Sequence, residues 1–389
     1  MSFPALAWRS LLFHGSMKPL RSWTGIMKRS SYRDLLALAS CLDGRLPDEI
    51  DWDAVIDLAN KTMTIPSLAV AVARFARQDD IPEEVRTYLA AIYQRNSQRN
   101  SRLNSQLEEA VSRLNDIGIE PVAMKGAAIL VAQRQDEIGA RMLTDLDIFV
   151  RPAEMARAIA ALQSVGYETR EDAGVGSWPG NPKFRLPVVL ARPADAGSID
   201  LHCRLKGPAS FSDIEWLYRN GNRMALAGGH VYIPSPFAQV VYLMLHDQFQ
   251  DGDYWRGLVD LRHLLDIANI ARSTGEIQWE VLRSLFSAGY ERNAIDTQIL
   301  TISALFNIGS TPAALFGKAA HFQLWRRKIQ IERQYLRASF TLLTLLTELL
   351  HYPSWDRFGG EPHSSRRQET KRKLRELRRI FRPIAPGKA

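Results

Sequence analysis

Residues 142–150, MLTDLDIFV, place two carboxylates two positions apart within a short apolar run. Successive side chains of a β-strand point to opposite faces of its sheet. Leu146 and Ile148 therefore face one side, whereas Asp145 and Asp147 face the other. This alternation predicts a strand with one face in a hydrophobic core and the other face available for chemistry.

A second run, residues 198–205 (SIDLHCRL), repeats this alternation and carries a third carboxylate. Ile199 and Leu201 lie on its apolar side, and Asp200 and His202 lie on its polar side. We expect the two strands to bring the three carboxylates together. Hard oxygen ligands favour Mg²⁺ or Mn²⁺, which leave coordination positions for substrate phosphates. A lone Asp-x-Asp pair is more often a solvated turn, and the sequence upstream of the pair is what favours a metal site.

Upstream, residues 119–133 (IEPVAMKGAAILVAQ) indicate a short strand, a break at Lys125-Gly126 and an alanine-rich helix. The first N–H groups of a helix lack intrahelical acceptors and bind anions. Gly126 would let a phosphate approach the backbone. The alternative is an ordinary glycine in a strand-to-helix turn.

Hydrophobic periodicity divides the chain into five regions. Apolar residues recur with helical spacing before residue 117 and after Pro236, and short strands alternate with helices between them. The expected regions are a flexible N-terminal extension (1–31), a helical lead-in (32–116), an α/β catalytic core (117–207), a C-terminal helical domain (208–355) and a basic tail (356–389). Within the core, strands are expected in 118–125, 144–150, 166–169, 184–192 and 198–205, and helices in 126–134 and 153–164.

Composition limits the class of protein. The chain has 389 residues, 46% of them hydrophobic, and a net charge of +8. Its two cysteines, Cys41 and Cys203, have no disulfide or zinc-ligand pattern, which favours a reducing cytoplasm. No run of about 18 to 20 apolar residues predicts a transmembrane helix. The first thirty residues lack the apolar core of a signal peptide, so we expect a cytoplasmic protein.

Much of the positive charge lies in residues 365–382, SRRQETKRKLRELRRIFR. Two interpretations stay open: a solvated end, or an arm that binds nucleic acid or another anionic partner. Phe381 is its single aromatic residue, which argues against base recognition by stacking. Since the segment 364–389 has few apolar residues, we expect its deletion to leave the fold intact.

The ordered motifs resemble those of the nucleotidyltransferases of the DNA polymerase beta superfamily, and in particular an uncharacterised bacterial branch. That branch carries a Lys-Gly turn, an Arg before an Asp-hydrophobic-Asp strand, and a later hydrophobic-Asp-Leu-His strand. The matching residues are Lys125-Gly126, Arg141, Asp145-Leu146-Asp147 and Ile199-Asp200-Leu201-His202. The resemblance runs from about residue 33 to residue 270. It implies an α+β fold, with a polymerase-beta-type nucleotidyltransferase α/β core built on a mixed sheet and flanked by N-terminal and C-terminal helical regions.

The resemblance also implies a reaction. The enzyme would move a nucleoside monophosphate from a nucleoside triphosphate such as ATP to an unidentified acceptor, and pyrophosphate would leave. Asp145 and Asp147 would bridge Mg²⁺ or Mn²⁺ ions. Asp200 would complete the metal site and accept the acceptor's proton. The superfamily's Gly-Ser turn is Gly126-Ala127 here, so Lys125 is expected to supply the missing phosphate contact.

Four further side chains have a structural interpretation, and three of them also have a functional one. Arg141 would neutralise the triphosphate, or form a salt bridge with Asp145. His202 would orient a carboxylate or help to move a proton, and His246 more simply satisfies a buried partner. Arg262 lies four residues before Asp266 in a predicted helix, where an intrahelical ion pair is the simplest expectation.

Three functions stay open from the sequence. The first is an active nucleotidyltransferase with a small-molecule, peptide or protein acceptor. The second is a nucleic-acid-tailing or tRNA-modifying enzyme that is anchored by the basic tail, and the third is a non-catalytic nucleotide-binding or regulatory protein. The intact spacing of the aspartates favours the first two. We expect Asp147→Asn to abolish transfer, and relief of like-charge repulsion to preserve or raise stability.

Overall fold

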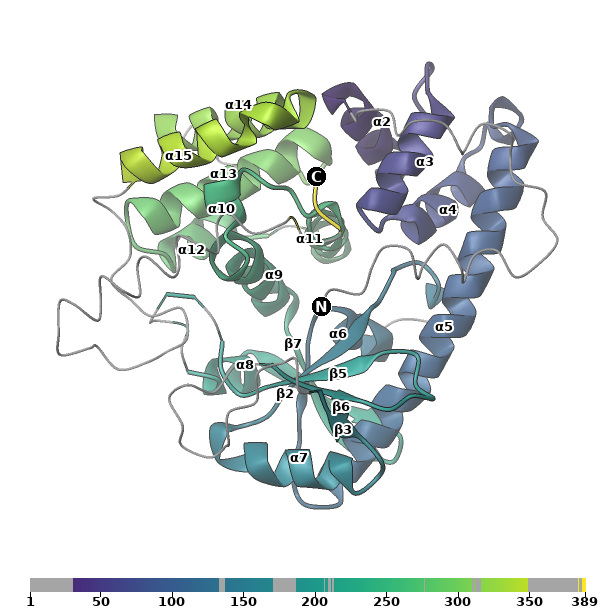
Figure 1. Cartoon of the computed structure of the whole chain (residues 1–389), viewed down its shortest axis with the longest axis vertical. Helices are drawn as coiled ribbons and strands as arrows, with labels where there is room; N and C mark the ends of the chain where they lie inside the picture. Colours follow the sequence, from purple (N-terminus) through teal and green to yellow (C-terminus); the bar gives the residue numbers. More distant parts are fainter. Residues whose placement is uncertain are drawn as a thin grey trace.

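The computed structural model describes residues 31–132, 137–170, 187–205, 207–208, 211, 213–275, 277–309, 311, 316–348, 384 and 387–389. Over these residues the protein is α+β, as predicted, and has two layers of structure (Figure 1). A seven-stranded mixed sheet occupies one layer. Helices α2–α4 and α10–α15 form the other, and α5 runs along one side of both.

The strand order in the sheet is β3-β4-β5-β2-β1-β7-β6. β2 runs parallel to β5 and antiparallel to β1, and β1 runs parallel to β7. All five strands expected between residues 118 and 205 are confirmed. The bounds of the strands are β1 Val122–Ala123, β2 Asp145–Phe149, β3 Glu168–Thr169, β4 Val188–Ala191, β5 Ser198–His202, β6 Gly221–Leu226 and β7 Gly229–Pro234.

Helices α2–α5 precede the sheet, and α6 and α7 are the two helices expected in the core. Their bounds are α2 Tyr32–Leu42, α3 Trp52–Lys61, α4 Ile65–Arg74, α5 Glu83–Asn115, α6 Lys125–Ala132, α7 Met155–Gln163, α8 Glu215–Arg219, α9 Pro236–Leu245, α10 Asp253–Arg256, α11 Leu261–Thr274, α12 Trp279–Ser284, α13 Tyr290–Leu305, α14 Lys318–Glu332 and α15 Arg337–Glu348. Short 3-10 turns occupy Gln78–Asp80, Pro152–Glu154 and Gln334–Leu336, and a π-helix, η6, spans His246–Gln250. None of the described helices is long and apolar enough to cross a membrane.

The two faces of the sheet have different coverings. Leu146 and Ile148 of β2 lie in a core shared with α5, α6 and α7. On the opposite face, Phe149 packs with α8 and with Tyr242 of α9. The predicted alternation along β2 is therefore confirmed. The face that carries the aspartates lies toward α8 and α9, and α9 leads from the last strand, β7, into the helical layer.

Helix α5 holds the loops that lead into the two aspartate-bearing strands. Asn96 and Asn100 donate hydrogen bonds to carbonyls at Ile138, Gly139 and Arg141, at 2.6 to 2.9 Å. Arg99 donates to the carbonyls of Leu143 and Ala196, and Gln106 to that of Gly197. These amide and guanidinium groups satisfy loop carbonyls that would otherwise lack partners inside the protein.

Two strands lie where the sequence analysis expected only helices. β6 and β7 form a hairpin within residues 208–355, and β7 extends the sheet by pairing with β1. The apolar pattern that predicts a strand is weak in β6, because this edge strand is mostly exposed. The turn Ala227-Gly228-Gly229 was the available hairpin signal, with both Ala227 and Gly228 at positive φ.

The end of the basic tail also differs from the expectation of an independent arm. Residues Gly387–Ala389 pack against the helical layer, where Val259 and Ala389 exchange two backbone hydrogen bonds of 3.1 and 2.9 Å. Lys388 forms an isolated β-bridge with Asp260 and its side chain is buried. Deletion of 364–389 would therefore remove a packed segment. Residues 349–383 and the extension 1–30 lie outside the described residues.

Candidate active site

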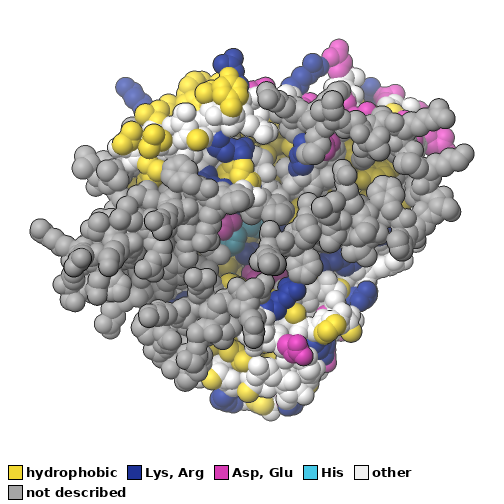
Figure 2. Space-filling view, in the orientation of Figure 1, with side chains coloured by type: hydrophobic (Ala, Val, Ile, Leu, Met, Phe, Trp, Pro, Cys, Tyr) yellow, Lys and Arg dark blue, Asp and Glu magenta, His cyan; other side chains and the backbone are white. Residues whose placement is uncertain are grey.

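The two polar strand faces meet as the sequence predicted. β2 and β5 are parallel neighbours, and their register places Asp147 directly opposite Asp200 and Asp145 opposite Ser198. Side chains that share a face in neighbouring strands lie beside one another. Asp145, Asp147 and Asp200 thus share one face of the sheet, toward α9. Histidine and acidic side chains are visible near the centre of the face drawn in Figure 2.

Asp147 is the most buried of the three aspartates, at 4% exposed. Its Oδ1 lies 3.1 Å from Lys125 Nζ and 3.2 Å from His202 Nε2. Burial by itself would raise the pKa of Asp147, but the Lys125 ammonium and the hydrogen bond with His202 outweigh it and hold that pKa well below its usual range. Removing this carboxylate would leave a buried ammonium without its partner. The structure therefore predicts that Asp147→Asn lowers stability, in contrast to the expectation from like-charge repulsion.

Asp200 is in the opposite electrostatic situation. Burial raises the pKa of its carboxyl, and the neighbouring charges of Asp145 and Asp147 raise it further, to about 7. Its hydrogen bond from Ser198 Oγ is long, at 3.4 Å. A carboxyl with this pKa exchanges its proton near neutral pH, which suits a general base.

Lys125 is placed by a local backbone conformation that its side-chain contacts support. It begins α6 and has a φ of 47°, in the left-handed region that non-glycine residues adopt at a cost. Burial would lower its pKa, but Asp147, Tyr242 and Asp145 outweigh it and hold the pKa above its usual value. The ammonium is therefore charged, with its Nζ 6.0 Å from the centre of the Tyr242 ring.

Gly126 has a packing role that the sequence did not indicate. A Cβ built on it would lie 2.3 Å from Leu143 Cδ2, so the side chain of Leu143 occupies the space that any other residue would need. Lys125 and Gly126 also provide the first N–H groups of α6, which have no acceptor within the helix. Both the packing and the anion-binding interpretation of Gly126 are therefore compatible with the structure.

Arg141 does not form the expected alternative salt bridge with Asp145. Its Nε lies 2.8 Å from Asp266 Oδ2 and 2.9 Å from Asp266 Oδ1, and its Nη2 lies 2.6 Å from Asp266 Oδ2. The expected Arg262–Asp266 pair is therefore wrong as well, and Arg262 lies 3.4 Å from Asp260 instead. Arg141 joins the loop before β2 to α11, a partner 125 residues away that helical spacing could not identify. Its predicted phosphate contact stays a prediction.

His202 is a buried side chain held between an aromatic ring and a carboxylate. Its imidazole stacks on Phe149 with ring centres 4.5 Å apart, and its Nε2 contacts Asp147. Phe149 in turn makes an edge contact with Tyr242. This arrangement fixes the direction of the Asp147 carboxylate, in agreement with the orienting role that the sequence suggested.

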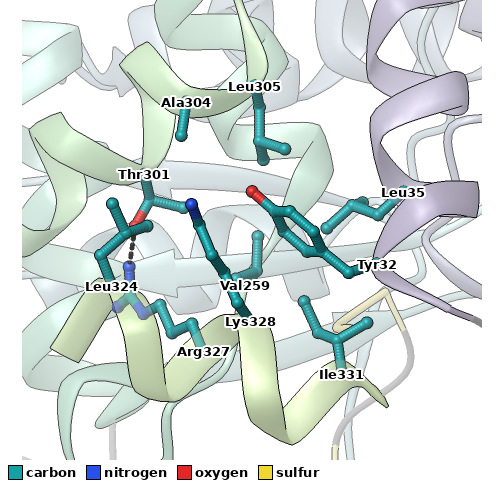
Figure 3. A pocket seen from close by; sticks show the side chains of 10 residues that line it. All are labelled: Tyr32, Leu35, Val259, Thr301, Ala304, Leu305, Leu324, Arg327, Lys328 and Ile331. Atoms are coloured by element: carbon teal, nitrogen blue, oxygen red, sulfur yellow. Dashed lines mark hydrogen bonds between the residues drawn. The ribbon is translucent and has the colours of Figure 1, made fainter. Parts of the chain in front are cut away.

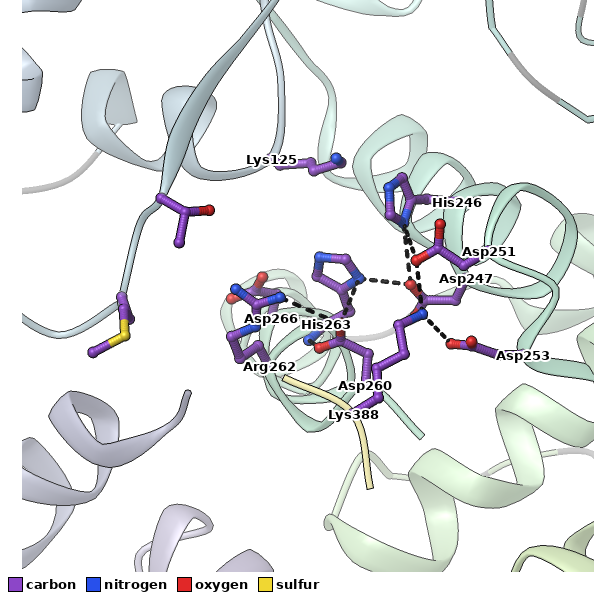
Figure 4. Close-up of polar contacts among 12 residues, drawn as sticks. Lys125, His246, Asp247, Asp251, Asp253, Asp260, Arg262, His263, Asp266 and Lys388 are labelled. Carbon is purple, nitrogen blue, oxygen red and sulfur yellow. Dashed lines mark hydrogen bonds and ion pairs between the residues drawn. The ribbon is translucent and has the colours of Figure 1, made fainter. Parts of the chain in front are cut away.

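The sequence analysis did not identify the contribution of α9 and η6. Tyr242 borders Lys125, and His246 lies one helical turn further on, facing the same ammonium (Figure 4). Burial lowers the pKa of His246 despite the opposing charge of Asp251, which favours a neutral imidazole. The π-helix begins at His246, and such insertions frequently occur at functional sites. The residues around His246 in this apolar helix do not indicate a partner for it. Its residue type was therefore the only sequence feature that could suggest a role at the site.

The donor atoms of the aspartates suit a divalent cation. Three carboxylates on one strand face provide hard oxygen ligands, and the charges of Asp145 and Asp147 add to burial in raising the pKa of Asp200. Within the described residues, a group of three ligand atoms within 4.8 Å of one another is found at His246, Asp247 and His263 rather than at the aspartates. That second group is already bonded internally, since His263 Nδ1 lies 2.6 Å from Asp247 Oδ1.

A small pocket elsewhere in the molecule does not contribute to this site. It lies between α2, α13 and α14, where Tyr32, Leu305 and Ile331 line it (Figure 3). Arg327, at its edge, is buried and donates a 2.7 Å hydrogen bond to Thr301. None of the aspartates of β2 and β5 lines this pocket, and its walls are the helical core.

The family of the protein follows from its sequence match. Residues 48–306 match the model of a family described as uncharacterised nucleotidyltransferase, over more than half of the chain. The chain belongs to this family. The resemblance drawn from the ordered motifs is thus confirmed, and the protein is a nucleotidyltransferase. No curated protein matches the chain.

Two solved structures align weakly with this nucleotidyltransferase. One is the solution structure of the antibiotic-resistance factor ANT(2'')-Ia, with 12% identity over 53% of this chain and 97% of that chain, and a TM-score of 0.33. The other is the crystal structure of an antigenic nucleotidyltransferase-like protein from Paracoccidioides brasiliensis, with 13% identity over 62% of this chain and 93% of that chain, and a TM-score of 0.28.

Proposed function

We propose that this nucleotidyltransferase moves a nucleoside monophosphate from a nucleoside triphosphate to a hydroxyl group of a small-molecule, peptide or protein acceptor, with pyrophosphate leaving. The observation that supports this proposal is the register of β2 and β5, which aligns Asp147 with Asp200 on the face that also carries Asp145. Lys125, at the start of α6, adds positive charge on the same side.

The proposed cofactor is Mg²⁺ or Mn²⁺, held by Asp145, Asp147 and Asp200. When bound, such a cation neutralises the polyphosphate and stabilises the attacking and leaving oxygens. Asp200 is the proposed acceptor of the proton of the acceptor hydroxyl, because it lies opposite Asp147 on the strand face that would hold the cation. His202 keeps Asp147 oriented through its stacked position on Phe149.

Lys125 and the beginning of α6 are the proposed polyphosphate contacts. The ammonium carries a full charge in a partly buried position, and the first N–H groups of the helix point where an anion is favoured. Lys125 neutralises Asp147 in the chain alone, and a cation at the aspartates would release its charge for the phosphates. Arg141 stays a predicted phosphate contact, and binding a phosphate would require it to break its ion pair with Asp266.

Transfer is tested with each of the four nucleoside triphosphates, labelled at the α-phosphate, incubated with the enzyme and a cell lysate. We expect label on an acceptor with one triphosphate preferred, and none with Asp147→Asn. Asp116→Asn, in an exposed ion pair with Arg113, is the matched control and should retain transfer. Label released only as free monophosphate by the wild type would contradict transfer to an acceptor.

Metal dependence is tested separately by calorimetry of ATP binding in excess Mg²⁺ and in chelator. We expect binding only with the cation, because the aspartates otherwise repel the phosphates. Equal affinity under the two conditions would overturn the proposed metal site while leaving the fold and the family unaffected.

A further inference from the structure

A second acidic cluster lies in the helical layer, behind His246. Its carboxylates come from η6, the following turn, α10 and the start of α11, and they are Asp247, Asp251, Asp253 and Asp260 (Figure 4). Asp247, Asp253 and Asp260 are at most 2% exposed. Buried carboxylates require charged or hydrogen-bonded partners, since the cost of removing them from water is large.

The cluster contains one ammonium group, supplied by a distant segment of the chain. Lys388 Nζ lies 2.6 Å from Asp253 Oδ2 and 2.7 Å from Asp251 Oδ2, and the lysine side chain is 3% exposed. Residues 387–389 hold it there through their backbone. Gly387 N donates to the Lys61 carbonyl at 3.1 Å, and Ala389 pairs with Val259. Lys388 thus occupies the pocket as a ligand would.

The carboxylates of this cluster differ in how many of their oxygens have hydrogen-bond partners. Asp247 is saturated by His263 at 2.6 Å and Gln298 at 3.2 Å. Asp253, in contrast, has a buried Oδ1 with no hydrogen-bond partner among the described residues, beside the Oδ2 that binds Lys388. An ammonium has three N–H donors, and two of them are accounted for by Asp251 and Asp253. The pocket therefore offers more acceptor atoms than its present occupant uses.

The pocket is adjacent to the candidate active site. Asp251 Oδ2 lies 3.7 Å from His246 Nδ1, and His246 faces Lys125 (Figure 4). An ammonium in the pocket therefore holds the Asp251 carboxylate in place. This carboxylate borders His246, the first residue of the π-helix η6. This connects residues 387–389 to the site through one ion pair and one histidine.

We propose that Asp251 and Asp253, backed by Asp247 and Asp260, form a binding pocket for a primary alkylammonium group, which this chain fills with its own Lys388. Residues 387–389 are an internal ligand that holds η6 and α10 in place beside the sheet. The pocket selects a compact ammonium with N–H donors on an unbranched stem, because its acceptors are close together and its walls are buried.

The test replaces the tethered ammonium with a soluble one. Lys388→Ala removes the atoms of a propylammonium group, so n-propylammonium should bind the vacated pocket. We expect the melting temperature to fall by about 5 °C or more and to recover at least half of that loss with millimolar n-propylammonium. Tetramethylammonium, which has no N–H donor, and n-propanol, which has no charge, should not restore it. No recovery with n-propylammonium, or equal recovery with tetramethylammonium, would overturn the proposal.

Two further variants separate the pocket from a general loss of charge. Lys318→Ala is the matched control, because Lys318 is exposed at the start of α14 and its truncation should change the melting temperature by less than about 1 °C. Should Lys388→Ala fail to fold, Asp253→Asn in the full chain takes its place. We expect it to increase hydrogen exchange at the Ala389 amide by at least about tenfold, and wild-type protection there would refute the pocket.

Discussion

The two acidic clusters of this nucleotidyltransferase differ in how their charge is balanced. In the sheet, Asp145, Asp147 and Asp200 share one lysine, and Asp200 has a pKa raised to about 7. In the helical layer, Asp251 and Asp253 hold a buried lysine directly, and histidine and amide groups satisfy their neighbours. Asp253 also has a pKa raised to about 7, because burial and the charges of Asp247 and Asp251 outweigh Lys388. The clusters therefore differ in what lies between their carboxylates: a buried ammonium lies between Asp251 and Asp253 in the helical layer, whereas in the sheet the ammonium of Lys125 pairs with Asp147.

The largest expected effect tests whether the sheet cluster performs chemistry. Asp147→Asn should lower the transfer rate at least about 10²-fold, by removing a metal ligand and the acceptor of Lys125 and His202. It should also lower stability by about 3 kcal/mol, because the buried Lys125 loses its partner. Rate and denaturant unfolding are measured on the same preparation. Retention of wild-type turnover would refute the assignment of this site.

The next effect concerns the link between the two layers. Arg141→Met should destabilise the protein by roughly 3 kcal/mol, because it leaves Asp266 unpaired where both side chains are about 10% exposed. Arg33→Met is its control, since Arg33 and Glu49 form a fully solvated pair that contributes little. Urea unfolding measures both variants. Equal small losses would show that the Arg141–Asp266 contact is not a structural link.

A smaller effect concerns the pH dependence of the sheet cluster without metal. The folded pKa of Asp200 is about 7, above its unfolded value near 3.9, so between these pH values the folded state binds the extra proton. Stability should therefore fall as pH rises from about 4 to 7, by roughly 2 kcal/mol after allowing for partial exposure. Asp200→Asn should be free of this loss and more stable than the wild type at pH 8. Parallel pH profiles in chelator would contradict the raised pKa.

The smallest effect tests packing beneath the site. Gly126→Ala should cost about 1 to 2 kcal/mol, because the new methyl group collides with Leu143. Adding Leu143→Ala should recover part of that loss by opening the space. Gly317→Ala is the matched control, since nothing lies within 4 Å of its added Cβ. A Gly126→Ala variant that is as stable as the wild type yet binds ATP poorly would favour phosphate approach as the reason for this glycine.

Local patterns predicted the parts of the protein that depend on local rules. Alternation along β2 and β5 identified both faces, and the order of the motifs identified the family. The sequence does not determine which residues distant in the chain pair with each other, because many residues satisfy the same local pattern. Asp266 pairs with Arg141 rather than with Arg262, and Lys388 is buried although it follows a strongly basic stretch. The exposed strand β6 lacked the apolar alternation that would have predicted it.

Helix α5 has a consequence for how the aspartates stay aligned. At about 1.5 Å per residue it is roughly 50 Å long, and its Asn100, Arg99 and Gln106 bind the loops before both β2 and β5. A slip of one residue in β2 would turn Asp147 into the core, and a slip in β5 would do the same to Asp200. The helix therefore helps to set the positions of the three aspartates through the loops that it binds, although none of its side chains is proposed to touch the substrate. An insertion before either strand would change the alignment of the aspartates.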